Sequence, residues 1–366
     1  MKSVLFESHH LYYLPQFIPI IEAMQKRESY SISASISKSV DESEMELFQT
    51  EIKRLGINYI HAETEQDRLE ALKNAKFDIV VVGNIGRLNQ IVADHTIAVL
   101  VYHGIGLKNT YYWDTDERID LRSVESENRF RDLENAGEKN QILTGFTKLD
   151  GLTNQSYSDM SKQWEKSSLE RNRKTVLYAP SFYPSSQEKF LPFISDLAKQ
   201  VNVVIKLHDF SWRQKKYQYQ GQAALALAKN HNNIFVVPPE EYNILPWLEF
   251  SDLLISDISS VLFEFLVLDR PIVQTDFYSL KLRHRLFPKK INNRLDLQRA
   301  SEIGFAKKVK DPKLVIPVVL SELKNPEKLS DQRKSGIKTF LYKADGQASI
   351  RLIDAIEEKM QTGESL

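Results

Sequence analysis

The chain contains no cysteine among its 366 residues. It therefore has no disulfide, no thiolate metal site and no cysteine nucleophile, although this absence leaves the cellular compartment undecided. No apolar run approaches the roughly 18 residues of a membrane-spanning helix. Residues 1–10 are too short and too soon polar for a signal peptide. These absences predict a soluble protein that is not secreted by the usual route.

An excess of charge of either sign is also missing, because Lys+Arg and Asp+Glu number 49 each. Bulk electrostatics therefore do not draw the chain onto nucleic acid, and no nucleic-acid partner is expected. Any membrane contact must come from a local patch. The sequence also lacks a phosphate-binding P-loop, a Gly-x-Ser-x-Gly elbow and a zinc motif. We therefore expect neither a cofactor nor a metal.

What the chain does contain is an alternation of short apolar strands and amphipathic helices, which is typical of mostly parallel sheets. Its length fits two domains, and its 42% hydrophobic and 27% charged residues are those of an ordinary globular protein. In the first half, strands are predicted at 3–6, 30–36, 58–60, 78–82 and 98–102, and helices at 14–25, 41–55 and 65–74. In the second half, strands are predicted at 175–179, 203–207, 234–237, 253–255 and 271–273, and helices at 190–200, 218–230, 243–249, 260–268 and 346–360.

The two series predict an α/β protein with two Rossmann-like domains whose parallel sheets face a central cleft, which is the GT-B-like architecture. We place one domain at 1–155 and the other at 156–344. A C-terminal helix within 345–366 is expected to pack back toward the N-terminal domain. The charged segment 116–138 is expected to form a surface helix and loop.

Polar groups follow the apolar strands at three places, and ligands of parallel sheets bind beyond the carboxyl ends of strands. The first is His103-Gly-Ile-Gly-Leu-Lys108, where the glycines allow a ligand to approach closely and Lys108 can balance anionic charge. Histidine titrates near neutral pH, which suits His103 to accept a proton from an attacking hydroxyl. The other two places are Lys206-Leu-His208 and Ser256-Asp-Ile-Ser-Ser260. Together they predict an active site.

Six motifs, in order, resemble those of the CDP-glycerol glycerophosphotransferases of teichoic acid and capsule synthesis. His103-Gly-Ile-Gly-Leu-Lys108 is similar to their His-Gly-x-x-x-Lys, Lys206-Leu-His208 to their Lys-Leu-His, and Ser256-Asp-Ile-Ser-Ser-Val-Leu-Phe-Glu-Phe265 to their Thr-Asp-Tyr-Ser-Ser-Val-x-Phe-Asp-Phe. The other three motifs are Leu177-Tyr-Ala-Pro-Ser-Phe182, Gly145-Phe-Thr-Lys-Leu-Asp150 and Asp345-Gly-Gln-Ala-Ser-Ile-Arg351. Departures from the family pattern at Gly106, Phe182 and Asp209 leave the nucleotide and the transferred group open.

The resemblance implies a transferase that moves glycerol phosphate, or a related phospho-alditol, from a CDP-linked donor to a hydroxyl of a lipid-linked or polymeric glycan, with release of CMP. Domain 1–155 would bind the acceptor, and domain 156–344 the nucleotide donor. His103 would be the general base, and His208 would stabilise the departing nucleotide. The residues expected to bind the donor and its phosphates are Lys108, Ser259, Ser260, Asp257, Glu264 and Arg351.

These residues also have structural interpretations. A histidine after a buried strand is often a satisfied core residue, and serines before a helix commonly cap it. Glu264 fits a solvated helix position as well as a contact to ribose hydroxyls. Asp257 cannot attract a phosphate by charge, so it is expected to orient its loop or His208. Two other functions stay open, namely a GT-B glycosyltransferase that uses a nucleotide sugar and an inactive GT-B-like scaffold subunit.

Three weaker candidates remain. His9 and His10 follow the first strand and could meet the acceptor, or serve the structure equally well. Asp114-Thr-Asp116 has the Asp-x-Asp spacing of some metal sites, but in this charged segment we expect a surface turn and no metal. The basic stretch 281–299 is expected to be solvated, or to rest on anionic lipid at about 1 kcal/mol per basic residue. The expected location is the cytoplasm, with a peripheral contact at the inner face of the cell membrane.

Overall fold

The computed structural model describes residues 1–107, 116–287, 289 and 295–362. The chain divides into two units, and we describe each by itself. The first comprises Met1–Ile105, Tyr111–Asn154 and Thr339–Leu366. The second comprises Gly106–Thr110 and Gln155–Lys338, so nearly all of it is inserted within the first.

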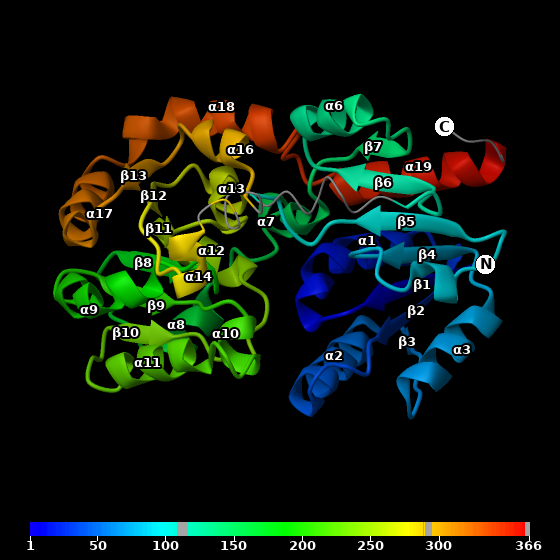
Figure 1. Cartoon of the computed structure of the whole chain (residues 1–366), viewed down its shortest axis with the longest axis horizontal. Helices are drawn as coiled ribbons and strands as arrows, with labels where there is room; N and C mark the ends of the chain where they lie inside the picture. Colours follow the sequence, from blue (N-terminus) through cyan, green and yellow to red (C-terminus); the bar gives the residue numbers. More distant parts are fainter. Residues whose placement is uncertain (108–115, 288, 290–294, 363–366) are drawn as a thin grey trace. The chain divides into compact units, whose positions relative to one another are not determined.

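The described residues of the first unit form a parallel sheet of seven strands in the order β3-β2-β1-β4-β5-β6-β7 (Figure 1). The central strands are apolar and fully buried, as strands covered on both faces must be. The strands are β1 (Lys2–Ser8), β2 (Tyr30–Ile36), β3 (Asn58–Tyr59), β4 (Ile79–Val82), β5 (Ile97–Val101), β6 (Leu121–Val124) and β7 (Gln141–Leu143).

Capping residues set the ends of two helices in this unit. Asp41 accepts a hydrogen bond from the backbone N–H of Glu44 and so caps α2, which ends at Gly56 in the left-handed conformation. Thr64 and Asp67 form a capping box at the start of α3. The helical segments are η1 (Leu11–Tyr13), α1 (Leu14–Lys26), α2 (Glu42–Leu55), α3 (Glu65–Ala75), α4 (Leu88–Ile91), α6 (Glu127–Asn135), η2 (Thr147–Leu149), α7 (Asp150–Thr153) and α19 (Ala348–Thr362).

Strand β6 corrects one expectation. The segment 116–138 does contain the helix α6, but Leu121–Val124 is a fully buried strand rather than a surface loop. The side chain of Arg122 is 0% exposed, and its guanidinium donates to Tyr102 Oη at 2.7 Å and to Glu138 Oε2 at 3.2 Å. A buried arginine is tolerated here because its charge is paired and hydrogen-bonded.

The C-terminal helix α19 packs on the first unit through two of the sequence motifs. The buried carboxylate of Asp150 accepts the backbone N–H groups of Ala348 at 3.1 Å and Ser349 at 2.8 Å, at the start of the helix. Burial raises the pKa of Asp150, and these hydrogen bonds oppose that rise. Further along the helix, Tyr30 donates to Glu357 at 2.6 Å.

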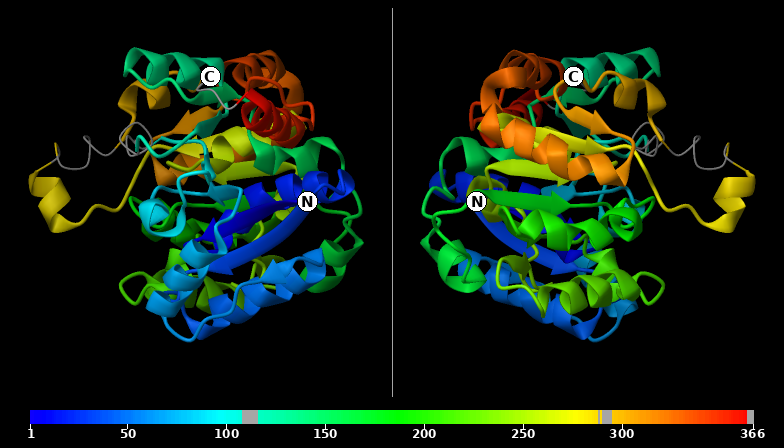
Figure 2. Two further views of the ribbon diagram at one scale, coloured as in Figure 1. Left: turned by 90° about the vertical axis from the view of Figure 1, so that its right-hand side faces the viewer. Right: turned by 90° about the vertical axis from the view of Figure 1, so that its left-hand side faces the viewer.

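The described residues of the second unit form a parallel sheet of six strands in the order β10-β9-β8-β11-β12-β13 (Figure 1). Helices cover both faces of the sheet (Figure 2). The strands are β8 (Thr175–Ala179), β9 (Asn202–Ile205), β10 (Ile234–Val236), β11 (Leu253–Ser256), β12 (Ile272–Thr275) and β13 (Lys307–Val309). The helical segments are α8 (Ser161–Ser167), α9 (Gln187–Ala198), α10 (Phe210–Arg213), α11 (Gln218–Ala228), α12 (Leu245–Phe250), α13 (Val261–Glu264), η3 (Phe265–Leu268), α14 (Leu282–Leu286), α16 (Leu297–Ser301), η4 (Pro312–Leu314), α17 (Val315–Lys324), η5 (Pro326–Leu329) and α18 (Ser330–Phe340).

Each sheet has one point where the direction of strand addition reverses. In the first unit it lies between β1 and β4, and in the second between β8 and β11. Open parallel sheets bind ligands beyond the carboxyl ends of the strands at such points. The loops that follow β1, β4 and β5, and those that follow β8, β9 and β11, are therefore the places to look for function.

Candidate active-site residues

His103 lies just beyond the carboxyl end of β5 in the first unit, as the sequence predicted. Its imidazole is half-buried and stacks on the ring of Tyr13, with ring centroids 4.7 Å apart and planes 27° apart. The ring of Tyr12 lies 5.4 Å away. Tyr12 and Tyr13 belong to η1, which follows β1, whereas His103 follows β5. The surroundings of the His103 ring are therefore formed by the loops after two different strands.

His9 and His10 lie in the loop after β1, and both face carboxylates. His9 Nε2 is 3.6 Å from Glu7 Oε2, and His10 Nδ1 is 3.3 Å from Glu44 Oε1. Burial raises the pKa of Glu7, while the nearby charges of His9 and Arg68 lower it. The ring of His10 also stacks on Tyr12 at 5.1 Å. His10 therefore belongs to the same aromatic group as His103.

Two of the predicted residues, Lys108 and Asp114, lie outside the described residues. Asp116 is described, and its carboxylate accepts hydrogen bonds from Asn89 Nδ2 at 3.0 Å and from the backbone N–H of Arg118 at 2.8 Å. Within residues 1–107, 116–287 and 295–362, no three His, Asp or Glu side chains are grouped so that they could hold a metal ion.

His208 follows β9 in the second unit. Its Nδ1 accepts the backbone N–H of Phe210 at 3.1 Å. In the neutral ring the proton is therefore on Nε2, which can donate a hydrogen bond. Phe182, from the loop after β8, packs against the imidazole with ring centroids 4.7 Å apart. The tautomer and the ring position of His208 are thus both fixed by its own unit.

Asp257 lies at the carboxyl end of β11 and is completely buried. Its oxygens accept the backbone N–H of Ser181 at 2.7 Å and both the N–H and the hydroxyl of Ser186 at 2.9 Å. Burial raises its pKa, and these hydrogen bonds oppose the rise. The contacts tie β11 to the loop that carries Phe182. Asp257 therefore reaches His208 through that loop, in keeping with the orienting role expected for it.

Ser259, Ser260 and Glu264 follow in the next segment. The expected helix at 260–268 is present as α13 continued by η3. The Ser260 hydroxyl donates to Glu264 Oε1 at 3.0 Å, and Glu264 is 0% exposed. The solvated position that was one interpretation of Glu264 is therefore wrong. The Ser260 proton points at this carboxylate, which leaves Ser259, half-buried at the same turn, as the better-placed hydroxyl for a ligand.

Arg351 lies in α19 of the first unit, and its guanidinium is used within that unit. Nε donates to the carbonyl oxygen of Thr144 at 2.7 Å, while the two terminal nitrogens donate to the carboxylate of Asp345 at 3.0 and 2.9 Å. The first contact joins α19 to the residue directly before the motif Gly145–Asp150, and the second lies within the motif Asp345–Arg351. A role of Arg351 at the donor phosphates stays a prediction, whereas its structural role is visible.

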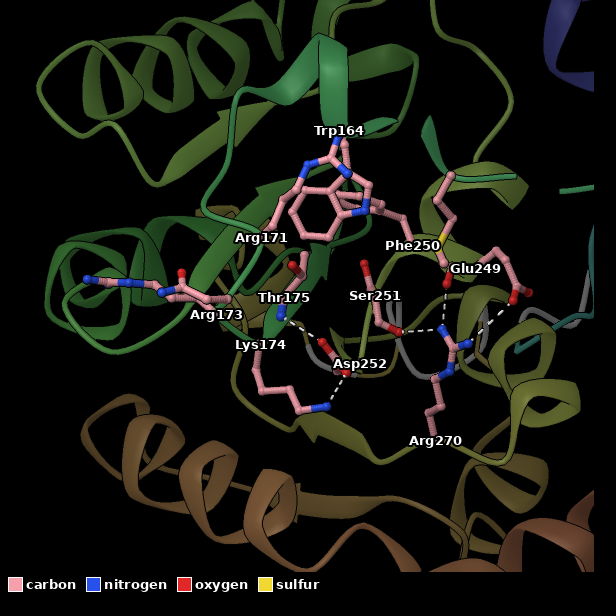
Figure 3. Close-up of a pocket in the computed structure, with 12 residues that line it drawn as sticks. Trp164, Arg171, Arg173, Lys174, Thr175, Glu249, Phe250, Ser251, Asp252 and Arg270 are labelled. Atoms are coloured by element: carbon pink, nitrogen blue, oxygen red, sulfur yellow. Dashed lines mark hydrogen bonds and ion pairs between the residues drawn. The ribbon is translucent and has the colours of Figure 1, made fainter. Parts of the chain in front are cut away.

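Trp164, Arg171 and Asp252 help to line a pocket of about 380 Å³ in the second unit (Figure 3). It lies at the amino ends of β8 and β11, since Thr175 begins β8 and Asp252 directly precedes β11. Lys174 Nζ is 2.7 Å from Asp252. Lys174 and Asp252 in its lining are already paired with each other, and the pocket lies at the amino ends of the strands, whereas His208 follows a carboxyl end. We therefore do not assign the active site to it.

Sequence reasoning missed the aromatic platform of Tyr12 and Tyr13. The available signal was their position directly after His9 and His10, in a loop that follows a strand of a parallel sheet. Their partner His103 is about ninety positions away in the sequence, so no local pattern joins them.

Comparisons with known proteins bear on the family and the fold of this chain. Teichoic acid ribitol-phosphate polymerases TarL and TarK of Staphylococcus aureus (strain NCTC 8325 / PS 47) are 29% and 27% identical over 157 residues, which is 40% of this chain. The match spans 26% and 28% of their own lengths, so this chain covers about a quarter of those curated relatives.

Among solved structures, the wall teichoic acid polymerase TagF superposes with a TM-score of 0.69 at 19% identity, over 98% of this chain and 89% of that chain. The S. aureus MnaA-UDP co-structure gives a TM-score of 0.65 at 15% identity, over 100% and 99%. These matches confirm the expected GT-B-like fold. The model of the family described as CDP-Glycerol:Poly(glycerophosphate) glycerophosphotransferase matches residues 4–358, which include His103, His208 and all six motifs. The chain belongs to this family.

Proposed function

We propose that this protein transfers glycerol phosphate, or a related phospho-alditol, from a CDP-linked donor to a hydroxyl of a lipid-linked or polymeric glycan. The observation that carries the proposal is the family match over residues 4–358, because it spans both units and both strand-end histidines. The TagF and TarL likenesses support an alditol-phosphate chemistry, and a TagF variant soaked with CDPG supports a CDP-linked donor.

In this reaction the acceptor oxygen attacks the donor's β-phosphorus, the bond from that phosphorus to the bridging oxygen breaks, and CMP leaves with the bridging oxygen. His103 takes the proton of the acceptor hydroxyl. Its place beyond β5, half-buried against Tyr13, supports this role because a general base must be held within reach of one oxygen.

His208 acts on the leaving group. With Nδ1 occupied by the Phe210 N–H, Nε2–H is the donor that can bond a phosphate oxygen of the departing CMP. A hydrogen bond aimed at the developing charge, from a ring that needs no reorientation, is the kind of contribution that preorganised sites make. Ser259 and Lys108 would add to the phosphate site.

The proposal is tested with a donor panel. Purified protein is supplied with CDP-glycerol, CDP-ribitol and UDP-N-acetylglucosamine together with a short glycerol-phosphate primer, and nucleotide release is measured. We expect release of CMP and a new phosphodiester in the ³¹P NMR spectrum of the product. Release of UDP with a glycosidic product would establish the nucleotide-sugar transferase instead, and release from no donor would favour the scaffold.

His103→Ala is the matched mechanistic variant. It should fold and bind CMP like the wild type while turnover falls about 100-fold or more, the usual scale for a lost general base. A control is His231→Ala, because His231 lies after α11 in the second unit, outside the six motifs. If folded His103→Ala keeps more than about a third of wild-type turnover, His103 is not the base.

We also propose a peripheral contact with anionic membrane through α14 and the residues after it. Leu282, Leu286 and Phe287 are 70%, 64% and 56% exposed. The basic side chains of Lys281, Arg285 and Lys289 are exposed beside them. Apolar and basic groups on one short segment suit an anionic lipid surface.

The proposed membrane contact is confined to α14 and the residues next to it. Helix α14, drawn in yellow, lies apart from the sheet of its unit in both views of Figure 2. Arg299 does not belong to this surface, since it is only 4% exposed. In the part of the chain that the structure describes, no helix is long and apolar enough to cross a membrane.

A further inference from the structure

The imidazole of His103 rests on a ring that comes from another loop. Tyr13, in η1 after β1, is only 3% exposed, and its ring lies nearly parallel to that of His103 at 4.7 Å. A ring packed against one face of an imidazole restricts rotation of that imidazole out of its plane. It leaves the edge, which carries the two nitrogens, to meet other groups.

The Tyr13 ring is itself held in place from the loop after β4. Asn84 Nδ2 donates to Tyr13 Oη at 2.5 Å. The Tyr13 ring packs directly against Gly83, where a side chain would clash with it, because a Cβ at position 83 would lie 2.7 Å from Tyr13 Cδ2. Real side chains do not tolerate such a distance, so a larger residue at 83 would move the ring.

The start of η1 is fixed from a third side. Glu44, buried in α2, accepts the backbone N–H of Leu11 at 2.7 Å. Tyr13 is thus placed by α2 at the beginning of its segment and by the β4 loop at its hydroxyl. These contacts hold in place the ring on which the His103 imidazole stacks.

We propose that Tyr13 is a positioning residue for His103, with Asn84 and Gly83 holding Tyr13 in place. The proposal rests on the proposed function, in which His103 is the general base. Tyr13 touches neither of the reacting atoms in this account. It keeps the imidazole edge directed toward the acceptor hydroxyl, and geometry of this kind strongly affects rates because small displacements of a catalytic group are costly.

The first test compares Tyr13→Leu with Tyr13→Phe. Tyr13→Leu removes the ring and should lower kcat about 10- to 100-fold, the scale of a misplaced catalytic group, while KM for the donor changes less than about twofold. Tyr13→Phe keeps the ring and loses only the Asn84 bond, so it should recover most of kcat. Tyr59→Leu is the matched control, because Tyr59 packs on Phe48 elsewhere in the first unit.

The second test is a double-mutant cycle. If Tyr13 acts through His103, Tyr13→Leu should cost almost nothing in a His103→Ala background. An equal loss in both backgrounds would overturn the inference and make Tyr13 a general structural residue. If turnover falls in His103→Ala but not in Tyr13→Leu, the positioning role of Tyr13 is refuted and the proposed function stands. If His103→Ala keeps full turnover, the proposed function is refuted.

Gly83→Ala covers the case in which Tyr13→Leu does not fold. It leaves every side chain of the platform present and displaces the Tyr13 ring, so it should lower kcat with little change in KM. A folded Gly83→Ala protein with wild-type kcat would overturn the inference independently.

Discussion

Replacing Arg351 separates two roles that the sequence could not distinguish. If its guanidinium serves the first unit alone, Arg351→Ala should destabilise that unit and leave CMP binding unchanged. The bond from Nε to the Thr144 carbonyl is charge-assisted and partly buried, and such bonds contribute about 1.5–3 kcal/mol. The pair with Asp345 contributes less, about 0.2–1 kcal/mol, because the Asp345 side chain is 43% exposed.

Together these contacts predict a loss of about 2–4 kcal/mol in the free energy of unfolding. For a unit of this size that corresponds to a fall in Tm of about 4–16 °C. Differential scanning calorimetry measures the loss, and calorimetric titration with CMP measures binding. Arg351→Lys should lie between, since an ammonium keeps the charge but loses the forked geometry.

The loss should also depend on pH. Hydrogen bonds from Arg351 lower the pKa of Asp345. A lowered pKa stabilises the fold above the unfolded carboxyl's value of about 3.9, and this stabilisation is lost as pH falls through the folded-state pKa. The difference between wild type and Arg351→Ala should therefore be larger at pH 7 than at pH 3. Unchanged stability together with CMP affinity weakened more than about threefold would refute the structural role and place the guanidinium at the donor.

Three other expectations follow from the second unit and the surface. His208→Ala should weaken CMP binding about 10- to 100-fold, because a hydrogen bond to a charged phosphate is lost. Ser260→Ala should weaken CMP binding much less. If calorimetry shows equal effects, the Ser260 hydroxyl donates to the ligand rather than to Glu264. Activity should survive excess EDTA, and Asp116→Asn should match wild type; loss of turnover that magnesium restores would show a metal. Replacing Leu286 and Phe287 by Glu should reduce sedimentation with phosphatidylglycerol vesicles about tenfold or more, and undiminished binding would exclude α14 from the contact.

Apolar runs made much of the fold predictable. The strands at 30–36 and 175–179 have the predicted bounds, because the continuous or alternating apolar residues there are typical of strands buried in a sheet. β6 escaped prediction because Arg122 interrupts its apolar pattern. The Tyr102 hydroxyl and the Glu138 carboxylate accept hydrogen bonds from the buried guanidinium, and residues 16 to 20 positions away give no local signal in the sequence.

The candidate site was predictable to the same extent. His103 and His208 could be placed at strand ends from the apolar residues before them, and the structure has them there. What a side chain bonds to could not be predicted in the same way. Arg351 lies in a motif that the family resemblance links to donor binding. Its partners Thr144 and Asp345 depend instead on how α19 packs against the rest of the first unit. Non-local packing decides such partners.

The return of the chain to the first unit has a consequence for synthesis. Leu352, Ile353 and Ile356 of α19 are fully buried, so the surface they cover stays uncovered until residues 348–362 have left the ribosome. Residues 155–338 of the second unit emerge before that moment and can fold while the first unit still lacks its last helix. The first unit is therefore completed after the second, and until then the surface that α19 covers stays open to non-native contacts.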